Sequence, residues 1–403
     1  MTNARATDLW PFAALCLVSF LSGFANAPFN ALLPVYVDAE LERVPLFAGS
    51  LRSVNLVIGG LLAMIAGRLC DLIGIRSALL IGLALGAVAG LVFNTADVWF
   101  LLLLVAVVGA GSGFQSTAGQ SYLLDSAPSH RMGVCTALFF LSGSGGSSAG
   151  LLTAGLLEDY WSFADIGLAM VGAMAVVLLF TILLLPAGRR PQPHRDREPM
   201  QLWQAYRPLF TQAPVRLFIA MRLLTTAFWG LANLLLPVLI ARAADDVSTA
   251  AYFLALSLSV AAVCQLTVGH LGDRYGRRWP LLGSYAVVLL SGAGLALSVE
   301  SLPGLFVYGT TLTAAAWSAS TLVPGLIREV APGDLTNRLL GLGHTTWSTA
   351  MVAGSMLGGL LQTLVDERTG MHPGAPFAAG TALAAGGSIC AWRLFNRMAR
   401  SPS

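Results

Sequence analysis

Long apolar runs separated by short polar segments extend along almost the whole chain. A helix needs about 20 mainly apolar residues to cross the hydrocarbon core of a bilayer, whereas a membrane β-strand needs about 9–11. Lipid admits only helices and closed barrels, because every backbone polar group must be hydrogen-bonded there. The runs are too long for barrel strands. They predict helical spans at 10–37, 46–67, 77–95, 98–122, 132–157, 166–186, 213–240, 248–270, 279–298, 303–327, 338–364 and 374–395.

One long polar segment interrupts this pattern halfway along the chain. It is rich in proline and charged residues, the composition of a linker between structural units. The sequence therefore predicts an N-terminal six-helix bundle over 1–187, a cytoplasmic linker over 188–212 and a C-terminal six-helix bundle over 213–403.

The composition supports a membrane protein. Apolar residues make up 56% and charged residues 11% of the 403 residues, whereas charged residues make up about 25% of ordinary soluble domains. The five cysteines show no CxxC spacing, so no metal site or disulfide framework is indicated. No nucleotide-binding GxxxxGK[ST] motif occurs, and no cofactor is expected. The first apolar run is too long for a signal-peptide core and is interpreted as a retained span.

The basic residues predict how the chain is oriented. All 23 are arginines, and 19 of them fall on the side of the predicted spans that holds both termini. The other four are Arg43, Arg52, Arg242 and Arg368. Cytoplasmic loops are enriched in basic residues, so both termini are expected in the cytoplasm and the protein in the inner membrane. The net charge of +3 gives no reason to expect a nucleic-acid partner.

The two halves of the chain repeat each other. FNALLPV in the first span matches ANLLLPV in the seventh, which places Asn30 and Asn233 203 residues apart. GRLCDLIGIR at 67–76 likewise matches GHLGDRYGRR at 269–278. Parallel repeats of this kind predict a substrate site near the membrane midplane between two bundles.

The two glycines, the aspartate and the trailing arginines of these motifs resemble the loop between the second and third helices of each half of major facilitator superfamily transporters. In motif style the chain is nearest to the drug and metabolite exporters of the twelve-helix type. The resemblance implies an all-α membrane fold of two pseudo-symmetric six-helix bundles. It also implies a single-chain secondary transporter of a small molecule, not an enzyme.

The motif also has a physical interpretation. A tight turn favours glycine, and an aspartate is stabilised at the positive N-terminal end of a neighbouring helix. The resemblance implies that Asp71 meets the start of the eleventh span and Asp273 the start of the fifth. Together they would form a conformational latch. Its candidate residues are Gly67, Asp71, Arg76, Gly269, Asp273, Arg277 and Arg278. The alternative is a pair of polar turns that merely follow the charge bias of cytoplasmic loops.

The resemblance also indicates where a substrate would bind, because the first, fourth, seventh and tenth helices line the central cavity in that fold. The candidate contacts are Asn26, Asn30, Gln115, Arg222, Trp229, Asn233 and Trp317. The alternative is that each side chain simply hydrogen-bonds a neighbouring helix. Arg222 lies about 13 Å into its span at 1.5 Å per residue. It would there pair with an anionic substrate, or extend toward the membrane surface.

Proton coupling has few candidates in this sequence. Proton-driven carriers usually place Asp, Glu or His inside the bundle. Only His344 in the eleventh span meets this condition, and Asp125 at the cytoplasmic end of the fourth span is the other coupling candidate. The alternatives are a histidine that only packs, or transport without proton coupling.

The preferred function is export of a drug-like or metabolite compound, with proton antiport as the candidate drive. The LLP motif at 32–34 is common in exporters, but Ser147 and Ser355 stand where their signature has proline. One alternative is uptake or facilitated passage of an organic anion, centred on Arg222. A non-transporting receptor on the same fold is another alternative. A membrane-embedded enzyme is disfavoured, since no cluster of His and acidic residues falls on the spans.

Overall fold

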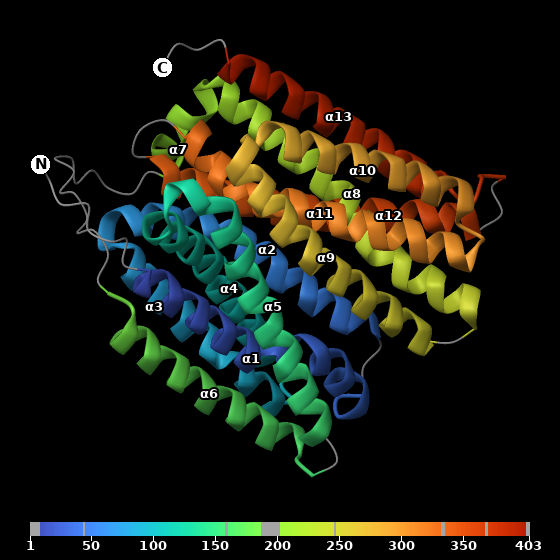
Figure 1. Cartoon of the computed structure of the whole chain (residues 1–403). Helices are drawn as coiled ribbons and strands as arrows, with labels where there is room; N and C mark the ends of the chain where they lie inside the picture. Colours follow the sequence, from blue (N-terminus) through green and yellow to red (C-terminus); the bar gives the residue numbers. More distant parts are fainter. Residues whose placement is uncertain are drawn as a thin grey trace, which may run out of the picture. The chain divides into compact units, whose positions relative to one another are not determined.

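The protein is helical throughout the part that the computed structural model describes. That part comprises residues 9–42, 45–157, 160–186, 202–245, 247–331, 335–366 and 370–399. Figure 1 shows the helices in chain order. The elements are α1 (Trp10–Ala39), α2 (Pro45–Ile73), α3 (Ile75–Gly86), η1 (Ala87–Asn94), α4 (Val98–Ser126), η2 (Ser129–Arg131), α5 (Met132–Leu157), α6 (Phe163–Leu184), α7 (Leu202–Thr211), α8 (Ala213–Ala244), α9 (Val247–Tyr275), α10 (Arg278–Ser298), α11 (Leu302–Val330), α12 (Thr336–Asp366) and α13 (Ala375–Met398).

These helices confirm the predicted fold class, because each predicted span coincides with a helix or with a pair of consecutive helices. Ten stretches of the described residues are long and apolar enough to cross a membrane. The helices α11 and α13 span 29 and 24 residues, but their threonines, serines and glycines make them less apolar. The predicted span 77–95 is divided into α3 and the 3-10 helix η1. Within η1, Gly90 packs against the Gly167 carbonyl so closely that a Cβ would collide with it.

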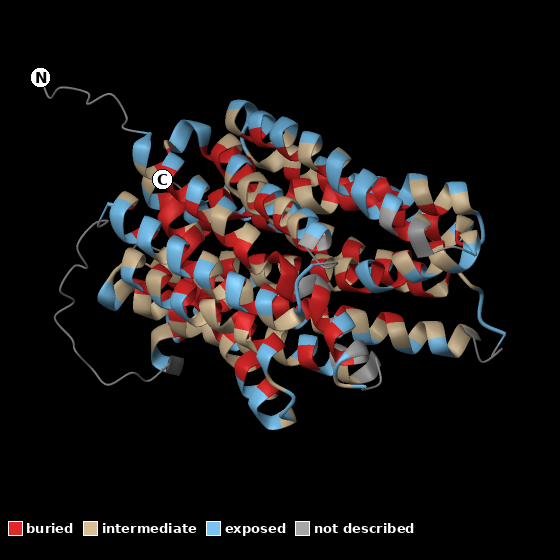
Figure 2. Ribbon diagram, turned by 90° about the horizontal axis from the view of Figure 1, so that it is seen from below, coloured by how far each residue is buried: buried red, intermediate tan, exposed pale blue. Residues whose placement is uncertain are grey.

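Many large apolar side chains are exposed, as expected for a surface that contacts lipid. Leu152 on α5 and Leu297 on α10 are 72% and 86% exposed. Figure 2 shows exposed positions along the lengths of the helices as well as at their ends. In water, leucines left this exposed would contribute almost none of the burial free energy that stabilises a soluble fold.

Polar residues define several helix ends. Asp97 accepts a hydrogen bond from the Phe100 N–H at 2.7 Å and so caps α4. Ser162 and Asp165 form a reciprocal capping box at the start of α6. Ser301 caps α11 by accepting from the Gly304 N–H at 3.4 Å. These side chains satisfy N–H groups that the first helical turn leaves without partners.

The chain forms two compact units. Unit 1 contains 1–129, 138–206 and 333–345, and unit 2 contains 130–137, 207–332 and 346–403. Unit 1 has a core around Tyr36, whose ring packs edge-on against Phe93 with centroids 5.4 Å apart. Unit 2 has a core around Phe228 and Phe253. Unit 1 includes the first turns of α12, and unit 2 includes the first turns of α5.

The repeated motif differs from the predicted loop, because most of it is helical. The α2 helix continues to Ile73 and α9 continues to Tyr275. Asp71 and Asp273 therefore lie in the last helical turns. Each turn is made around a single glycine with positive φ, 93° at Gly74 and 77° at Gly276. Glycine adopts this conformation without the steric cost that other residues meet. Of the predicted linker at 188–212, residues 188–201 lie outside the described residues, and 202–211 form α7.

Candidate functional site

In unit 2, Asp273 lies at the start of α5. Its Oδ1 accepts a hydrogen bond from the Gly133 N–H at 2.6 Å, and its Oδ2 accepts one from the Val134 N–H at 3.0 Å. Because α5 begins at Met132, both are N–H groups of the first turn that no helical carbonyl can satisfy. The carboxylate also meets the positive end of the helix dipole. Asp273 thus closes the N-terminus of a helix that is distant in sequence.

A close approach of two backbones makes this contact geometrically feasible. A Cβ at Gly269 would lie 2.6 Å from the Gly133 carbonyl oxygen, and a Cβ at Gly133 would collide with the Gly269 carbonyl. Both positions therefore require glycine. The first glycine of the motif serves helix packing, and the second makes the turn.

In unit 1, Asp71 uses different partners for its two oxygens. Oδ1 accepts a hydrogen bond from Asn337 Nδ2 at 2.9 Å, and Oδ2 accepts one from Arg338 Nε at 2.9 Å. The Asp71 and Arg338 side chains are 16% and 9% exposed. Gly67 lies against this site, since a Cβ there would be 2.6 Å from the Asn337 carbonyl oxygen. The first aspartate therefore forms a largely buried ion pair at the start of α12, whereas the second binds backbone N–H groups.

The short helix α7 is part of the Asp71 site. Arg338 Nη1 donates to the Ala205 carbonyl at 3.1 Å, and the Tyr206 hydroxyl donates to the Met64 carbonyl. Tyr206 is fully buried. Burial and the nearby Asp71 charge raise the pKa of the Tyr206 phenol, so the hydroxyl remains protonated and can donate. Sequence analysis missed Asn337, Arg338 and Tyr206. Tyr206 lies in the predicted polar linker, where no helical repeat of apolar residues indicated that its side chain would be buried.

The arginines of the two motifs contact other helix ends. Arg76 donates to the Ile182 carbonyl near the end of α6. Arg278 Nη2, at the matching position, donates to Asn396 Oδ1 at 3.0 Å near the end of α13. Cations are stabilised at helix C-termini. Both copies therefore join the start of one helix to the end of another.

An acid–base pair distinguishes the second motif from the first. Arg277 forms an ion pair with Glu329, near the end of α11. Burial lowers the pKa of the Arg277 guanidinium, and the negative charge of Asp273 opposes that shift. Ile75 occupies the corresponding position of the first copy, and Asp125, the counterpart of Glu329, is exposed. The unit 1 motif cannot form this pair.

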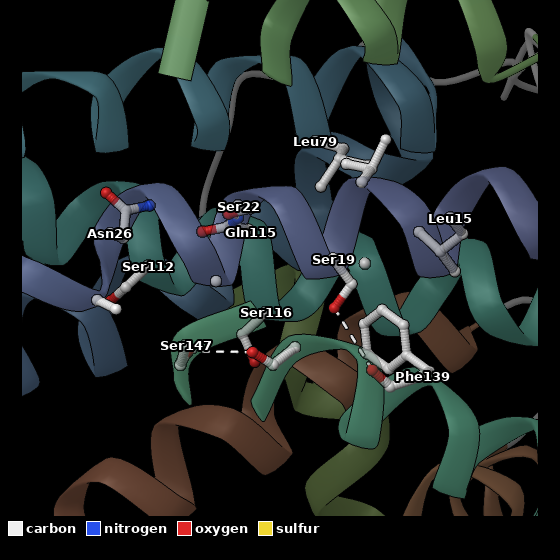
Figure 3. Close-up of a pocket in the computed structure, with 15 residues that line it drawn as sticks. Leu15, Ser19, Ser22, Asn26, Leu79, Ser112, Gln115, Ser116, Phe139 and Ser147 are labelled. Carbon is white, nitrogen blue, oxygen red and sulfur yellow. Dashed lines mark hydrogen bonds between the residues drawn. The ribbon is translucent and has the colours of Figure 1, made fainter. Parts of the chain in front are cut away.

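Unit 1 also contains a cavity of about 290 Å³. Figure 3 shows the side chains that line it. They come from α1, α3, α4 and α5 and are Leu15, Val18, Ser19, Ser22, Gly23, Asn26, Ala27, Leu79, Ser112, Gln115, Ser116, Gly119, Phe139, Gly143 and Ser147. Gln115 Nε2 donates to Ser22 Oγ across the α1–α4 contact. Asn26 Nδ2 lies 3.5 Å from Met174 Sδ.

The structure places two predicted substrate residues, Asn26 and Gln115, in this one cavity. Asn30 lies on α1, but its side chain is outside the described residues. The unit 2 candidates lie on two helices. They are Arg222, Trp229 and Asn233 on α8 and Trp317 on α11.

Arg222 and Asn233 differ in their surroundings. Arg222 has a buried Nε with no hydrogen-bond partner among the described residues. Asn233, three helical turns further along α8, is exposed within unit 2. Arg222 is therefore the unit 2 candidate with an unused buried donor.

The two coupling candidates lie at different distances from the cavity. His344 Nδ1 is 3.0 Å from Ser116 Oγ, and Ser116 lines the cavity. Gln120 Nε2 donates to the same hydroxyl at 3.2 Å. Asp125 is nine residues beyond Ser116 on α4, or about 13 Å along the helix. Of these two titratable groups, His344 is the one that contacts the cavity wall.

Comparison with known proteins identifies similar chains. The family model described as Major Facilitator Superfamily matches residues 15–262 and 218–403. Sugar efflux transporter A of Dickeya chrysanthemi is 27% identical over 98% of this chain and 98% of its own. Multidrug resistance protein MdtG of Serratia proteamaculans is 25% identical over 64% of each chain. The crystal structure of the E. coli fucose:proton symporter superposes with a TM-score of 0.75 at 18% identity, covering 95% of this chain and 98% of that one.

Proposed function

The chain belongs to the major facilitator superfamily, and from this premise we propose that it exports a small organic solute across the inner membrane by alternating access. The observation on which the proposal depends is the cavity of unit 1, where two amides and several hydroxyls lie among membrane-spanning helices. Such a site offers hydrogen bonds to a solute that has left water. Concave sites with a few converging polar groups are the usual form of small-molecule sites.

Alternating access requires two packings that differ little in free energy. The contacts of Asp71 with the start of α12 and of Asp273 with the start of α5 would stabilise one packing. Release of both helix starts would permit the other packing. The two motifs are thus proposed as the latch, with Gly67 and Gly269 setting the close approach.

The proposed direction and orientation rest on less specific features. The names of two similar proteins contain multidrug resistance and sugar efflux, and these favour export. The fucose symporter supports the shared fold alone. The arginine distribution favours cytoplasmic termini.

His344 is the proposed coupling residue if protons drive export, because it is bonded to the cavity wall. The protein is proposed to act as a monomer.

A flux assay in sealed proteoliposomes tests export. Protein is reconstituted in sealed vesicles, and the share of each orientation is measured by the reaction of an engineered cysteine beyond α13 with a membrane-impermeant thiol reagent. Solute movement across the membrane that responds to an imposed pH gradient is expected. A protein that binds solute but moves none in either direction would instead be a receptor on a transporter fold.

A second candidate, passage of an organic anion, is favoured by the unpartnered Nε of Arg222. On the proposed function, Arg222→Gln leaves transport of a neutral solute within about twofold of wild type, because Arg222 is not among the residues that line the unit 1 cavity and a neutral solute needs no opposite charge. The matched control is Arg216→Gln, which changes an exposed arginine near the start of the same helix. A tenfold loss of anion transport in Arg222→Gln alone, with folded protein retained, would favour the second candidate.

A further inference from the structure

The charge of the cavity wall restricts what the cavity can hold. Among the fifteen residues that line it, none has an acidic or basic side chain. His344 contacts the lining residue Ser116 without being one of the fifteen, and in its neutral form it adds no charge to the wall. A charged ligand that enters such a site loses its hydration without gaining an opposite charge, and this desolvation strongly opposes binding. The cavity therefore favours a ligand without formal charge.

Three of the five serines that line the cavity direct their hydroxyl hydrogens to backbone carbonyls, which leaves their oxygen lone pairs as the hydrogen-bonding groups. Ser112 donates to the Gly109 carbonyl at 2.8 Å, Ser147 to the Gly143 carbonyl at 3.0 Å, and Ser19 to the Phe139 carbonyl at 3.4 Å. A hydroxyl has one donor hydrogen and two acceptor lone pairs. Once the hydrogen is bonded to backbone, the oxygen remains able only to accept. Three positions on the wall thus select for donors on the ligand.

The amide of Asn26 adds an acceptor that has no partner. Its Oδ1 is buried and has no hydrogen-bond partner among the described residues. Gln115 already uses its amide N–H to reach Ser22. A buried acceptor left unsatisfied costs about ten- to a hundredfold in an equilibrium constant, which a donor on a ligand would recover. Asn26 lies two helical turns beyond Ser19 on α1, so acceptors are spread along the cavity.

The cavity also has an apolar wall and a modest size. Phe139, beside Ser19, contributes an aromatic ring, and Leu15, Val18 and Leu79 contribute aliphatic surface. The volume of about 290 Å³ is at the lower end of the range of roughly 300–1,000 Å³ for ligand sites. One sugar-sized ring fits that size better than a chain of rings.

We propose that the unit 1 cavity binds an uncharged solute with several hydroxyl groups, of the size of a monosaccharide glycoside or a small polyol. The proposal rests on the proposed function, because it names the solute class of the same cavity. Hydroxyl donors of the solute bond to Asn26 and the serine oxygens, and its C–H face packs on Phe139.

Binding to the purified full-length protein in lipid nanodiscs tests this, with probes that differ in one group. The neutral probes are methyl β-D-glucopyranoside, methyl β-D-galactopyranoside and mannitol. The comparison probes are the 6-carboxylate, the 6-amino and the fully O-methylated forms of the glucoside. At least one neutral probe is expected to bind with a Kd in the millimolar range or tighter. Each comparison probe is expected to bind at least about tenfold more weakly than the glucoside. Where the glucoside does not bind, the same three modifications are made to the neutral probe that does bind, and each modified form is compared with that probe.

The comparison probes separate the two parts of the proposal. The carboxylate and amino forms test charge, and the O-methylated form retains acceptors while it removes every O–H donor. Binding of a charged or O-methylated form as tightly as its hydroxylated parent would overturn the proposal. Failure of all three neutral probes to bind would overturn it as well.

A single substitution should change the selectivity of the cavity instead of merely removing binding. Asn26→Asp replaces the amide whose Oδ1 has no hydrogen-bond partner with a carboxylate. Binding of the protonated 6-amino glycoside is therefore expected to become about tenfold tighter or more. Asn94→Asp, the same change on η1 outside the cavity, is the matched control. Gln115→Glu gives the same test if Asn26→Asp does not fold. Unaltered selectivity in a folded variant would contradict the placement of the site.

These outcomes are distinct from failure of the proposed function. A neutral glycoside that binds but does not cross the membrane leaves the ligand class intact and rejects export. If only charged compounds cross the membrane, the proposed ligand class is rejected, whereas the proposed transport function is retained.

Discussion

Replacing Arg338 with glutamine is expected to lower the free energy of unfolding by about 3–5 kcal/mol, because it leaves the carboxylate of Asp71 largely buried without its ion-pair partner. The same change removes the bond from Nη1 to the Ala205 carbonyl and so loosens α7. Thermal and denaturant unfolding in nanodiscs measure the effect. Arg207→Gln, an exposed arginine on α7, is the matched control and should change stability by less than about 0.5 kcal/mol.

The double variant Asp71→Asn with Arg338→Gln separates an ion pair from simple packing. Removing both charges leaves no uncompensated charge, so the double variant is expected to be more stable than Arg338→Gln alone. If the losses of unfolding free energy in Asp71→Asn and in Arg338→Gln simply added in the double variant, the ion pair between Asp71 and Arg338 would not be the source of the effect. The Tyr206 hydroxyl and the Gly67 contact would then account for how α7 and α12 are held.

Replacing Asp273 with asparagine is expected to change the equilibrium between the two packings by roughly a hundredfold, or about 3 kcal/mol. Asparagine retains the shape, but it loses the charge that meets the start of α5. It also directs an NH₂ group at one of the two N–H donors of Gly133 and Val134. The packing shown by this structure should become less populated, and transport should fall.

Cysteine accessibility from each side of the membrane measures this change. The five native cysteines are free thiols and are replaced first, and single reporter cysteines are then introduced on α5 and α9. Glu300→Gln, an exposed acid between α10 and α11, is the control. Reporter cysteines labelled at wild-type rates from both sides would remove the latch role from Asp273, whatever happens to transport.

The apolar pattern predicted the spans well because lipid imposes a local rule. A segment surrounded by hydrocarbon must be apolar over its whole length and must satisfy its own backbone hydrogen bonds. Both properties are visible in consecutive residues. The same rule does not fix where a helix ends in a polar region, and α2 and α9 therefore continue through most of the motif that was expected to be a loop.

The candidate site could be predicted only in part. Asn26 and Gln115 were found because amides are unusual within apolar runs, and they line one cavity. The serines that share it were too common to stand out. Arg338 and Tyr206 were missed because their partners are 267 and 142 residues away in sequence. Contacts over such separations depend on which helix faces pack together.

The sequence by itself determined the membrane-spanning helices, the duplication and the pair of aspartate motifs, because burial in lipid and gene repetition leave marks on neighbouring residues. Only the tertiary structure decided that Asp71 pairs with an arginine while Asp273 binds backbone N–H groups. It also decided that α7 packs against the first of these sites and that uncharged polar groups share the wall of the unit 1 cavity with apolar side chains. The physical reason is that equivalent motifs meet different residues once distant helices pack, and the chemistry of a contact depends on both partners.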